Sequence, residues 1–110
     1  MHGTVSLRLT DSPARGEIAR HAVIVLAVRV GLPPVAADRV GTAVAAAVRA
    51  CPGGEVTITA TLDGGSALVA ITGGDDAWRT ESAAALGAFR ATVKGSHLTL
   101  RLRRTPLRAV

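Results

Sequence analysis

Apolar and polar residues alternate along several short segments of the chain, a pattern typical of strands that bury one face. From Val5 to Leu9 and from Leu98 to Leu102, every second residue is apolar, so these side chains are expected to share one face. The turn signal Asp63-Gly64-Gly65 separates two of the segments and predicts a hairpin. The predicted strands cover Thr4–Leu9, Glu55–Leu62, Ser66–Thr72, Ala91–Lys94 and His97–Arg103.

Two helices are predicted between the first two strands. The first starts at Asp11-Ser12-Pro13, where a capping side chain precedes a proline, and runs to about Val30. Its middle, AVIVLAV, also fits a strand by propensity, but the charged residues on both sides favour a helix. The second helix covers Val35 to Ala50. Apolar residues at three- and four-residue spacing predict its core stripe, which consists of Ala37, Val40, Val44 and Val48.

A third helix is predicted over Thr80–Arg90, after a loop at Gly73–Ala77. The resulting order is β-α-α-β-β-α-β-β. It predicts an α+β fold, a two-layer sandwich in which the helices cover one face of a mixed, mostly antiparallel sheet. We expect a single domain over residues 1–104 and a flexible tail at residues 105–110.

The composition of the chain limits the kinds of partner and the cellular compartment that we expect. The 110 residues carry 13 Lys and Arg against 8 Asp and Glu, a net charge of +5. A basic balance can indicate a polyanion partner, but the excess of Ala, Gly, Arg and Val is typical of a GC-rich genome, so we expect no nucleic-acid partner. The single cysteine, Cys51, indicates a reducing compartment. No long apolar run marks a signal peptide or a membrane span, so we expect a cytoplasmic protein.

Two stretches resemble a known family. Residues 36–50 are AADRVGTAVAAAVRA, and residues 53–74 are GGEVTITATLDGGSALVAITGG. Together they resemble the middle of bacterial anti-sigma regulatory factors, which are serine protein kinases of the histidine-kinase-like ATPase superfamily. That family holds Mg-ATP with an Asn on a helix, usually one turn after a Glu, and a later Asp-x-Gly-x-Gly loop contacts the adenine. The resemblance therefore implies the histidine-kinase-like ATPase fold.

The residues that carry the family's chemistry are missing, since the chain contains no Asn. One register of the resemblance places the family's Glu and Asn at Ala46 and Ala50, and a second places them at Thr42 and Ala46. Both registers put an alanine at the magnesium ligand, and a methyl group cannot bind a metal.

The adenine-contacting loop also departs from the family pattern. At the position where the family has its Asp, this chain has Gly73, and Gly74 follows. If the alignment with the family is shifted by two residues, Asp75 or Asp76 corresponds to that Asp. Ala77-Trp78 then stands where the family has its glycines. The alternative interpretation of this acidic pair is a solvated turn.

The resemblance leads to two functional hypotheses. The first is a regulatory protein-interaction module without catalytic residues, metal or cofactor, whose partner would be a sigma factor, an antagonist domain or a second copy of the chain. On this hypothesis, Thr42–Ala50 packs tightly where a nucleotide would sit. The alternative is a divergent serine protein kinase that still binds ATP and magnesium and acts on a partner protein.

Three side chains are candidates for an interface. Trp78, which is expected in a loop after the acidic pair, would be either an exposed anchor for a partner or a cap on the sheet core. Arg101 and Arg103 form a basic edge that would face either solvent or an acidic protein. The strand Thr4–Leu9 is expected at an edge of the sheet, where it would invite pairing with another chain.

Overall fold

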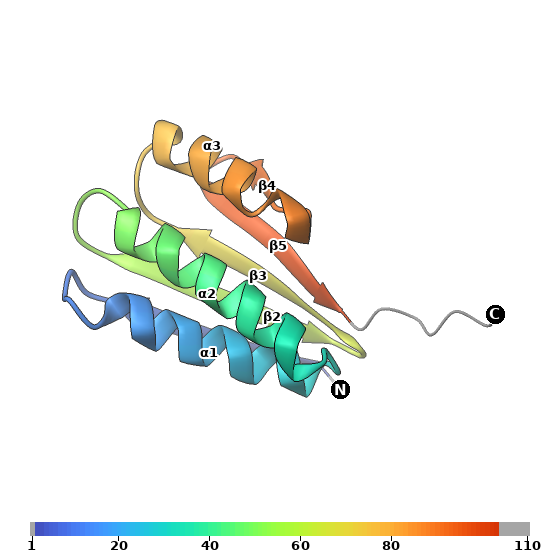
Figure 1. Cartoon of the computed structure of the whole chain (residues 1–110). Helices are drawn as coiled ribbons and strands as arrows, with labels where there is room; N and C mark the ends of the chain where they lie inside the picture. The colour runs from blue at the N-terminus through green and yellow to red at the C-terminus, as the bar shows by residue number, and fades with distance from the viewer. Residues whose placement is uncertain (1, 104–110) are drawn as a thin grey trace.

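Helices cover one face of an antiparallel sheet in the computed structural model, which describes residues 2–103 (Figure 1). Met1, Arg104 and the predicted tail at residues 105–110 lie outside the described residues. The α+β class, the order of elements and the placement of the helices on one face confirm the prediction. The elements are β1 (His2–Leu9), α1 (Arg15–Arg29), α2 (Pro34–Ala50), β2 (Val56–Asp63), β3 (Ser66–Thr72), α3 (Asp76–Ala85), a 3-10 turn at Gly87–Phe89, β4 (Thr92–Lys94) and β5 (His97–Arg103).

The sheet has the order β1-β2-β3-β5-β4, so β1 and β4 are its edges. Every pairing within the described residues is antiparallel, and the prediction of a mixed sheet is therefore wrong. The reason lies in the connections. β2 joins β3 and β4 joins β5 through tight hairpins, and the segment of α3 and β4 returns the chain so that β5 runs against β3.

The core forms between the sheet and the inner faces of α1 and α2. The stripe predicted on α2 is confirmed, because Ala37, Val40, Val44 and Val48 are fully buried. α1 and α2 approach each other closely at Gly41, where a Cβ atom would lie 2.6 Å from Cγ1 of Ile24. This contact depends on the missing side chain, because a β-carbon at that distance would push the two helices apart.

The predicted start of the first helix is wrong by a few residues. α1 begins at Arg15, after an Ala14 cap that makes no side-chain hydrogen bond, so Asp11 and Ser12 do not cap it. Instead, the Ser12 carbonyl accepts a hydrogen bond of 3.2 Å from the Arg15 amide, which makes a turn before the helix.

The third helix, in contrast, starts earlier than predicted, at Asp76 rather than Thr80. The Asp75 carboxylate accepts a hydrogen bond of 2.8 Å from the Trp78 amide, the usual geometry of an Asp at the N-terminus of a helix. Residues 76–78 are therefore helical, and Trp78 does not lie in a loop. The helix ends at Ala85 rather than Arg90, and Arg90 takes a left-handed conformation with φ of 58°.

The alternation in β1 is confirmed only at one end. Leu9 is buried and Leu7 is half-buried, but 54% of Val5 is exposed. The helix layer therefore covers the Leu9 end of β1 and leaves the other end open. No helix within residues 2–103 is long and apolar enough to span a membrane.

Candidate functional site

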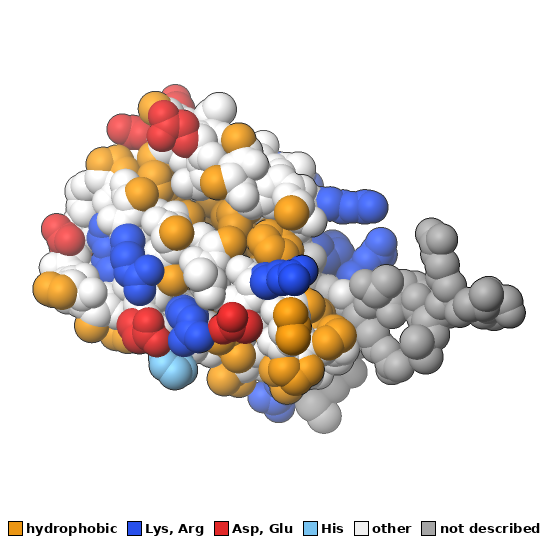
Figure 2. All heavy atoms as spheres, viewed as in Figure 1, with side chains coloured by type: hydrophobic (Ala, Val, Ile, Leu, Met, Phe, Trp, Pro, Cys, Tyr) orange, Lys and Arg blue, Asp and Glu red, His pale blue; other side chains and the backbone are white. Residues whose placement is uncertain are grey.

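A groove of about 470 Å³ separates the C-terminal half of α2 from α3. Figure 2 looks onto the helix layer, where hydrophobic side chains show between these two helices. Small residues form most of the walls. The lining residues are Ala43, Ala46, Ala47 and Ala50 of α2, Pro52, and Asp75, Ala77, Trp78, Glu81, Ser82 and Ala85 at or in α3.

The groove exists because alanines face α3 along α2. Ala46 and Ala50 are exposed on this side of the helix, while the neighbouring side, which faces the sheet, carries the buried valines. Alanine side chains do not reach across to α3, so a hollow remains between the helices. The prediction that Thr42–Ala50 packs tightly at this position is therefore wrong.

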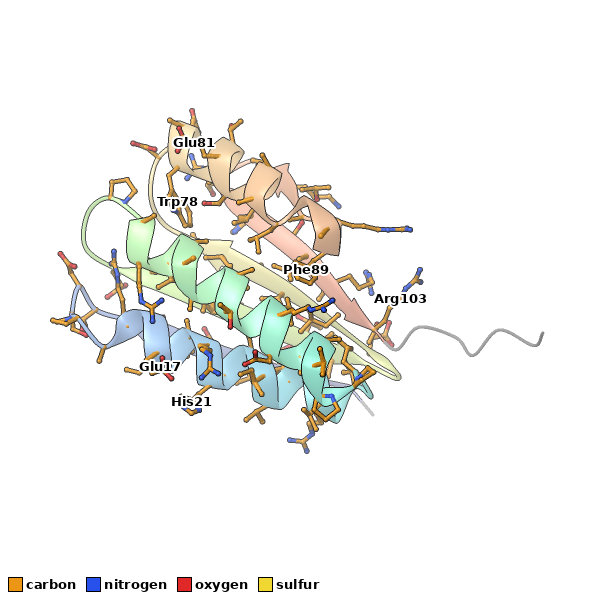
Figure 3. All side chains as sticks on the ribbon, viewed as in Figure 1. Glu17, His21, Trp78, Glu81, Phe89 and Arg103 are labelled. Carbon is orange, nitrogen blue, oxygen red and sulfur yellow. The ribbon has the colours of Figure 1, made fainter. Side chains whose placement is uncertain are left out.

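Trp78 forms the inner wall of the groove, between α2 and α3 (Figure 3). Only 5% of the residue is exposed. Its indole Nε1 donates a hydrogen bond of 2.9 Å to the Ala47 carbonyl. Of the two roles predicted for Trp78, the exposed loop anchor is wrong, and the buried position within the core is confirmed.

The backbone conformation before α3 requires the two glycines at positions 73 and 74. Gly73 and Gly74 have φ of 141° and 63°, conformations that favour glycine. A Cβ on Gly74 would lie 2.5 Å from Cε3 of Trp78, and one on Gly73 would lie 2.9 Å from the Glu55 carbonyl. The loop therefore needs glycine at position 74 so that the indole can pack against it, and at position 73 so that it can pass the backbone of Glu55.

The acidic pair after the glycines takes part in local contacts. Asp75 caps α3, and Asp76 forms an ion pair with Arg79. The Arg79 guanidinium also donates to the carbonyls of Gly73 and Gly74, at 3.0 and 3.3 Å. Arg79 thereby holds the glycine loop against α3. Nothing in the sequence indicated this role, because a charged residue in a helix is usually solvated.

The charge of the groove is negative. Asp75 and Glu81 are its charged lining residues, and the lining contains no Lys or Arg. Ala46 and Ala50, two of the positions where the resemblance places Mg-ATP ligands, belong to the alanine wall of the groove. Thr42, Gly73, Gly74 and Asp76 do not line it. The positions that the resemblance assigns to the magnesium ligand do not fit the ion, because alanine supplies no oxygen, and the lining has no Lys or Arg to pair with the phosphates.

The other predicted interface residues lie on a different surface. Leu98, Leu100 and Leu102 of β5 face the helices and are buried, so Arg101 and Arg103 project from the opposite face of the sheet. Both arginines are exposed, and Arg101 donates a hydrogen bond of 3.2 Å to the Ser66 hydroxyl. They cannot act together with Trp78 in one contact.

A buried arginine at the start of α1 holds the loop between α2 and β2. Arg15 is 5% exposed and donates hydrogen bonds of 2.7 and 2.8 Å to the carbonyls of Cys51 and Gly54. Asp11 lies 3.8 Å from the same guanidinium. The loop carries Pro52 into the groove lining, so Arg15 fixes one end of the groove.

Comparison of the chain with protein-family models and with curated proteins gives no match.

Proposed function

We propose that the chain is a regulatory protein-interaction module of the anti-sigma type that works without ATP. In this proposal the α2–α3 groove receives an apolar helical segment of a protein partner, with basic residues beside it. A sigma factor or an antagonist domain would supply the segment.

The observation that carries the proposal is the lining of the groove. Four alanines make one wall, and small side chains of this kind allow a partner helix to approach closely. The charged groups of the lining are the carboxylates of Asp75 and Glu81, which attract basic side chains. A phosphate site would instead present Lys, Arg or a glycine-rich series of amides pointing into the hollow.

The first test concerns the nucleotide. We expect Mg-ATP and Mg-ADP to leave the melting temperature of the protein unchanged. A ligand present at a hundred times its Kd would add about 2.7 kcal/mol to the free energy of unfolding, which is easily measured. A saturable rise in melting temperature at sub-millimolar nucleotide would contradict the proposal and favour the divergent kinase.

The second test concerns docking. Sigma factors and antagonist domains from the same organism would be titrated one at a time against the protein. We expect one of them to bind, and Ala46→Trp to weaken binding about a hundredfold by filling the groove. The control is Val35→Trp, because Val35 is 65% exposed on α2 outside the groove lining. Equal binding by both variants would place the contact elsewhere, and no binding by any candidate would overturn the proposed partner class.

A further inference from the structure

The sheet has a second face that no helix covers within residues 2–103 (Figure 1). Successive side chains of a strand point to opposite faces, so the residues between the buried ones form this open face. Hydroxyl groups make up most of it, as on β2, where its residues are Thr57, Thr59 and Thr61. Such a face is compatible with solvent, so only a departure from the hydroxyl pattern indicates a partner.

The charges of the open face are unevenly distributed. On β1, the Arg8 Nε lies 3.4 Å from a carboxylate oxygen of Glu55, so these two charges compensate each other. At the other side of the sheet, β3, β4 and β5 contain no Asp or Glu, but they carry Lys94, Arg101 and Arg103. None of these three side chains forms an ion pair with a residue of the range 2–103. We call these three residues the basic strip.

One large apolar side chain interrupts the hydroxyl pattern beside the basic strip. Leu68 of β3 points to the open face and is 38% exposed. In the register of the sheet it lies opposite Arg101 of β5 on one side and Thr61 of β2 on the other. A single exposed leucine is common on protein surfaces. Beside Arg101, however, one partner can bury the leucine and neutralise the arginine in the same contact.

Hydrogen bonds between neighbouring strands hold this area in place. The Arg101 guanidinium donates to the Ser66 hydroxyl of β3 at 3.2 Å. The hydroxyls of Thr92 and Thr99 lie 3.0 Å apart and join β4 to β5. Side chains that are fixed before binding lose less conformational entropy when a partner arrives. These contacts therefore prepare the area for binding.

The basic strip follows the direction of β5. Arg101 and Arg103 are about 7 Å apart, because alternate residues of a strand are separated by two steps of about 3.3 Å. Lys94 lies opposite His97 and extends the strip to about 20 Å. Asp63 lies two strands away from Arg103 in the same row of the register and bounds the basic area. Alternate side chains of an extended peptide have the same spacing, so acidic residues at every second position can meet these cations.

We propose that the open face of β3, β5 and β4 binds an extended, acidic segment of another protein. Carboxylates of the segment pair with the basic strip, and one apolar residue of the segment covers Leu68. The helix layer with the α2–α3 groove lies on the opposite face of the sheet. The proposal therefore goes beyond the proposed function and does not depend on it.

The side chains of this area favour a protein over other polyanions. Single-stranded nucleic acids bind through aromatic side chains that stack on the bases, and β3, β4 and β5 contain no Phe, Trp or Tyr. The phosphate backbone of a duplex offers no apolar group that would cover Leu68. An acidic lipid surface requires several apolar side chains that insert into it, and Leu68 is a single one. An acidic peptide with an apolar residue matches both features.

The first test uses fluorescein-labelled synthetic peptides of about seven residues, the length that spans the basic strip in extended form. One peptide alternates Glu with Ser and has Leu in place of one inner Glu. A second has Gln in place of every Glu, and a third has Ser in place of the Leu. Fluorescence anisotropy at about 0.05 M salt measures their binding to the whole chain.

We expect the acidic peptide with Leu to bind at least about tenfold more tightly than the Gln peptide and about threefold more tightly than the peptide without Leu. Its binding should weaken at about 0.5 M salt, because the charges of the basic strip are exposed and screened. Equal binding of the acidic and the Gln peptide, or no saturable binding of the acidic peptide, would overturn the proposal.

The second test locates the contact with variants of exposed residues, which should keep the melting temperature of the wild type. Arg101→Glu should weaken binding of the acidic peptide at least about tenfold. Arg39→Glu is the matched control, because Arg39 is exposed on α2 and the change in net charge is the same. Leu68→Thr should weaken binding of the peptide with Leu and leave binding of the peptide without Leu unchanged. Equal losses in Arg101→Glu and Arg39→Glu would overturn the proposal.

A random-sequence DNA, single-stranded or duplex, is the competing probe in the same assay. We expect it to displace the acidic peptide only weakly, because it has no apolar group for Leu68. If the DNA bound more tightly than the peptide and lost its binding in Arg101→Glu, the open face would belong to a nucleic acid and the proposal would be wrong.

Discussion

The indole Nε1 of Trp78 donates a hydrogen bond of 2.9 Å to the backbone carbonyl of Ala47, in the last turn of α2. In a continuing helix the Cys51 amide would bind that carbonyl, but it binds the Val48 carbonyl instead, at 3.2 Å. The carbonyls at the end of a helix need partners from outside it. Trp78 supplies one, and it thereby fixes the distance between the two walls of the groove.

Trp78→Phe should lower the free energy of unfolding by about 1 to 3 kcal/mol, because it leaves the Ala47 carbonyl without its donor. Trp78→Ala removes the buried ring as well and should cost about 3 to 5 kcal/mol. Urea denaturation measures both values. A Trp78→Ala variant as stable as the wild type would show that the side chain is not part of the core.

Gly74→Ala should destabilise the protein through the loop that covers Trp78. Gly64→Ala is the matched control, since Gly64 has nearly the same φ, 60° against 63°, with open space around a Cβ. Left-handed backbone alone costs alanine about 1 to 2 kcal/mol. The clash with the indole should add about 1 to 3 kcal/mol at Gly74. Equal losses in the two variants, measured by urea denaturation, would show that the loop moves without cost.

Much of the fold could be predicted from the sequence, because the patterns that define it are local. The valine stripe of α2, the hairpin at Asp63-Gly64-Gly65 and the alternating leucines of β5 each follow from a short stretch. The direction of β5 relative to β3 could not be predicted in this way. That direction depends on the position at which the segment of α3 and β4 brings the chain back to the sheet.

The candidate site was less predictable, because it is formed by pairs of distant residues. The sequence alone indicates that the alanines of α2 cannot serve as magnesium ligands, but the hollow beside them depends on the position of α3. One signal for the start of α3 is present in the sequence, because an Asp before a helical segment favours an N-terminal cap. A cap at Asp75 predicts a helix that includes Trp78. The burial of Arg15 could not be predicted from the sequence, because the carbonyls that it binds, those of Cys51 and Gly54, lie far along the chain.

Cys51 should react slowly with alkylating reagents in the folded protein. Burial is the main cause that raises the pKa of its thiol above the ordinary value, so less thiolate is present near pH 8. We expect the rate with iodoacetamide to rise at least about tenfold in urea, where the thiol is exposed. A folded protein that reacts as fast as the unfolded one would contradict the burial of Cys51.

The same raised pKa predicts how stability changes with pH. The unfolded chain loses the thiol proton at about pH 8.5, before the folded chain does. The free energy of unfolding should therefore fall as the pH rises above that value, and not below it. Urea denaturation between pH 7 and 10 measures this slope. Cys51→Ala should make the slope shallower, and an unchanged slope would assign it to other groups.

Arg15→Met should lower the free energy of unfolding by about 3 kcal/mol or more, because it leaves the Cys51 and Gly54 carbonyls without their charged donor. Arg15→Lys should recover only part of the loss, since an ammonium group cannot reach two carbonyls with the planar geometry of guanidinium. Arg39→Met is the control, because Arg39 is exposed on α2 and should change stability by about 0.5 kcal/mol or less. If Arg15→Met were as harmless as Arg39→Met, the loop between α2 and β2 would not depend on this side chain, and the end of the groove at Pro52 would have to be held by the backbone alone.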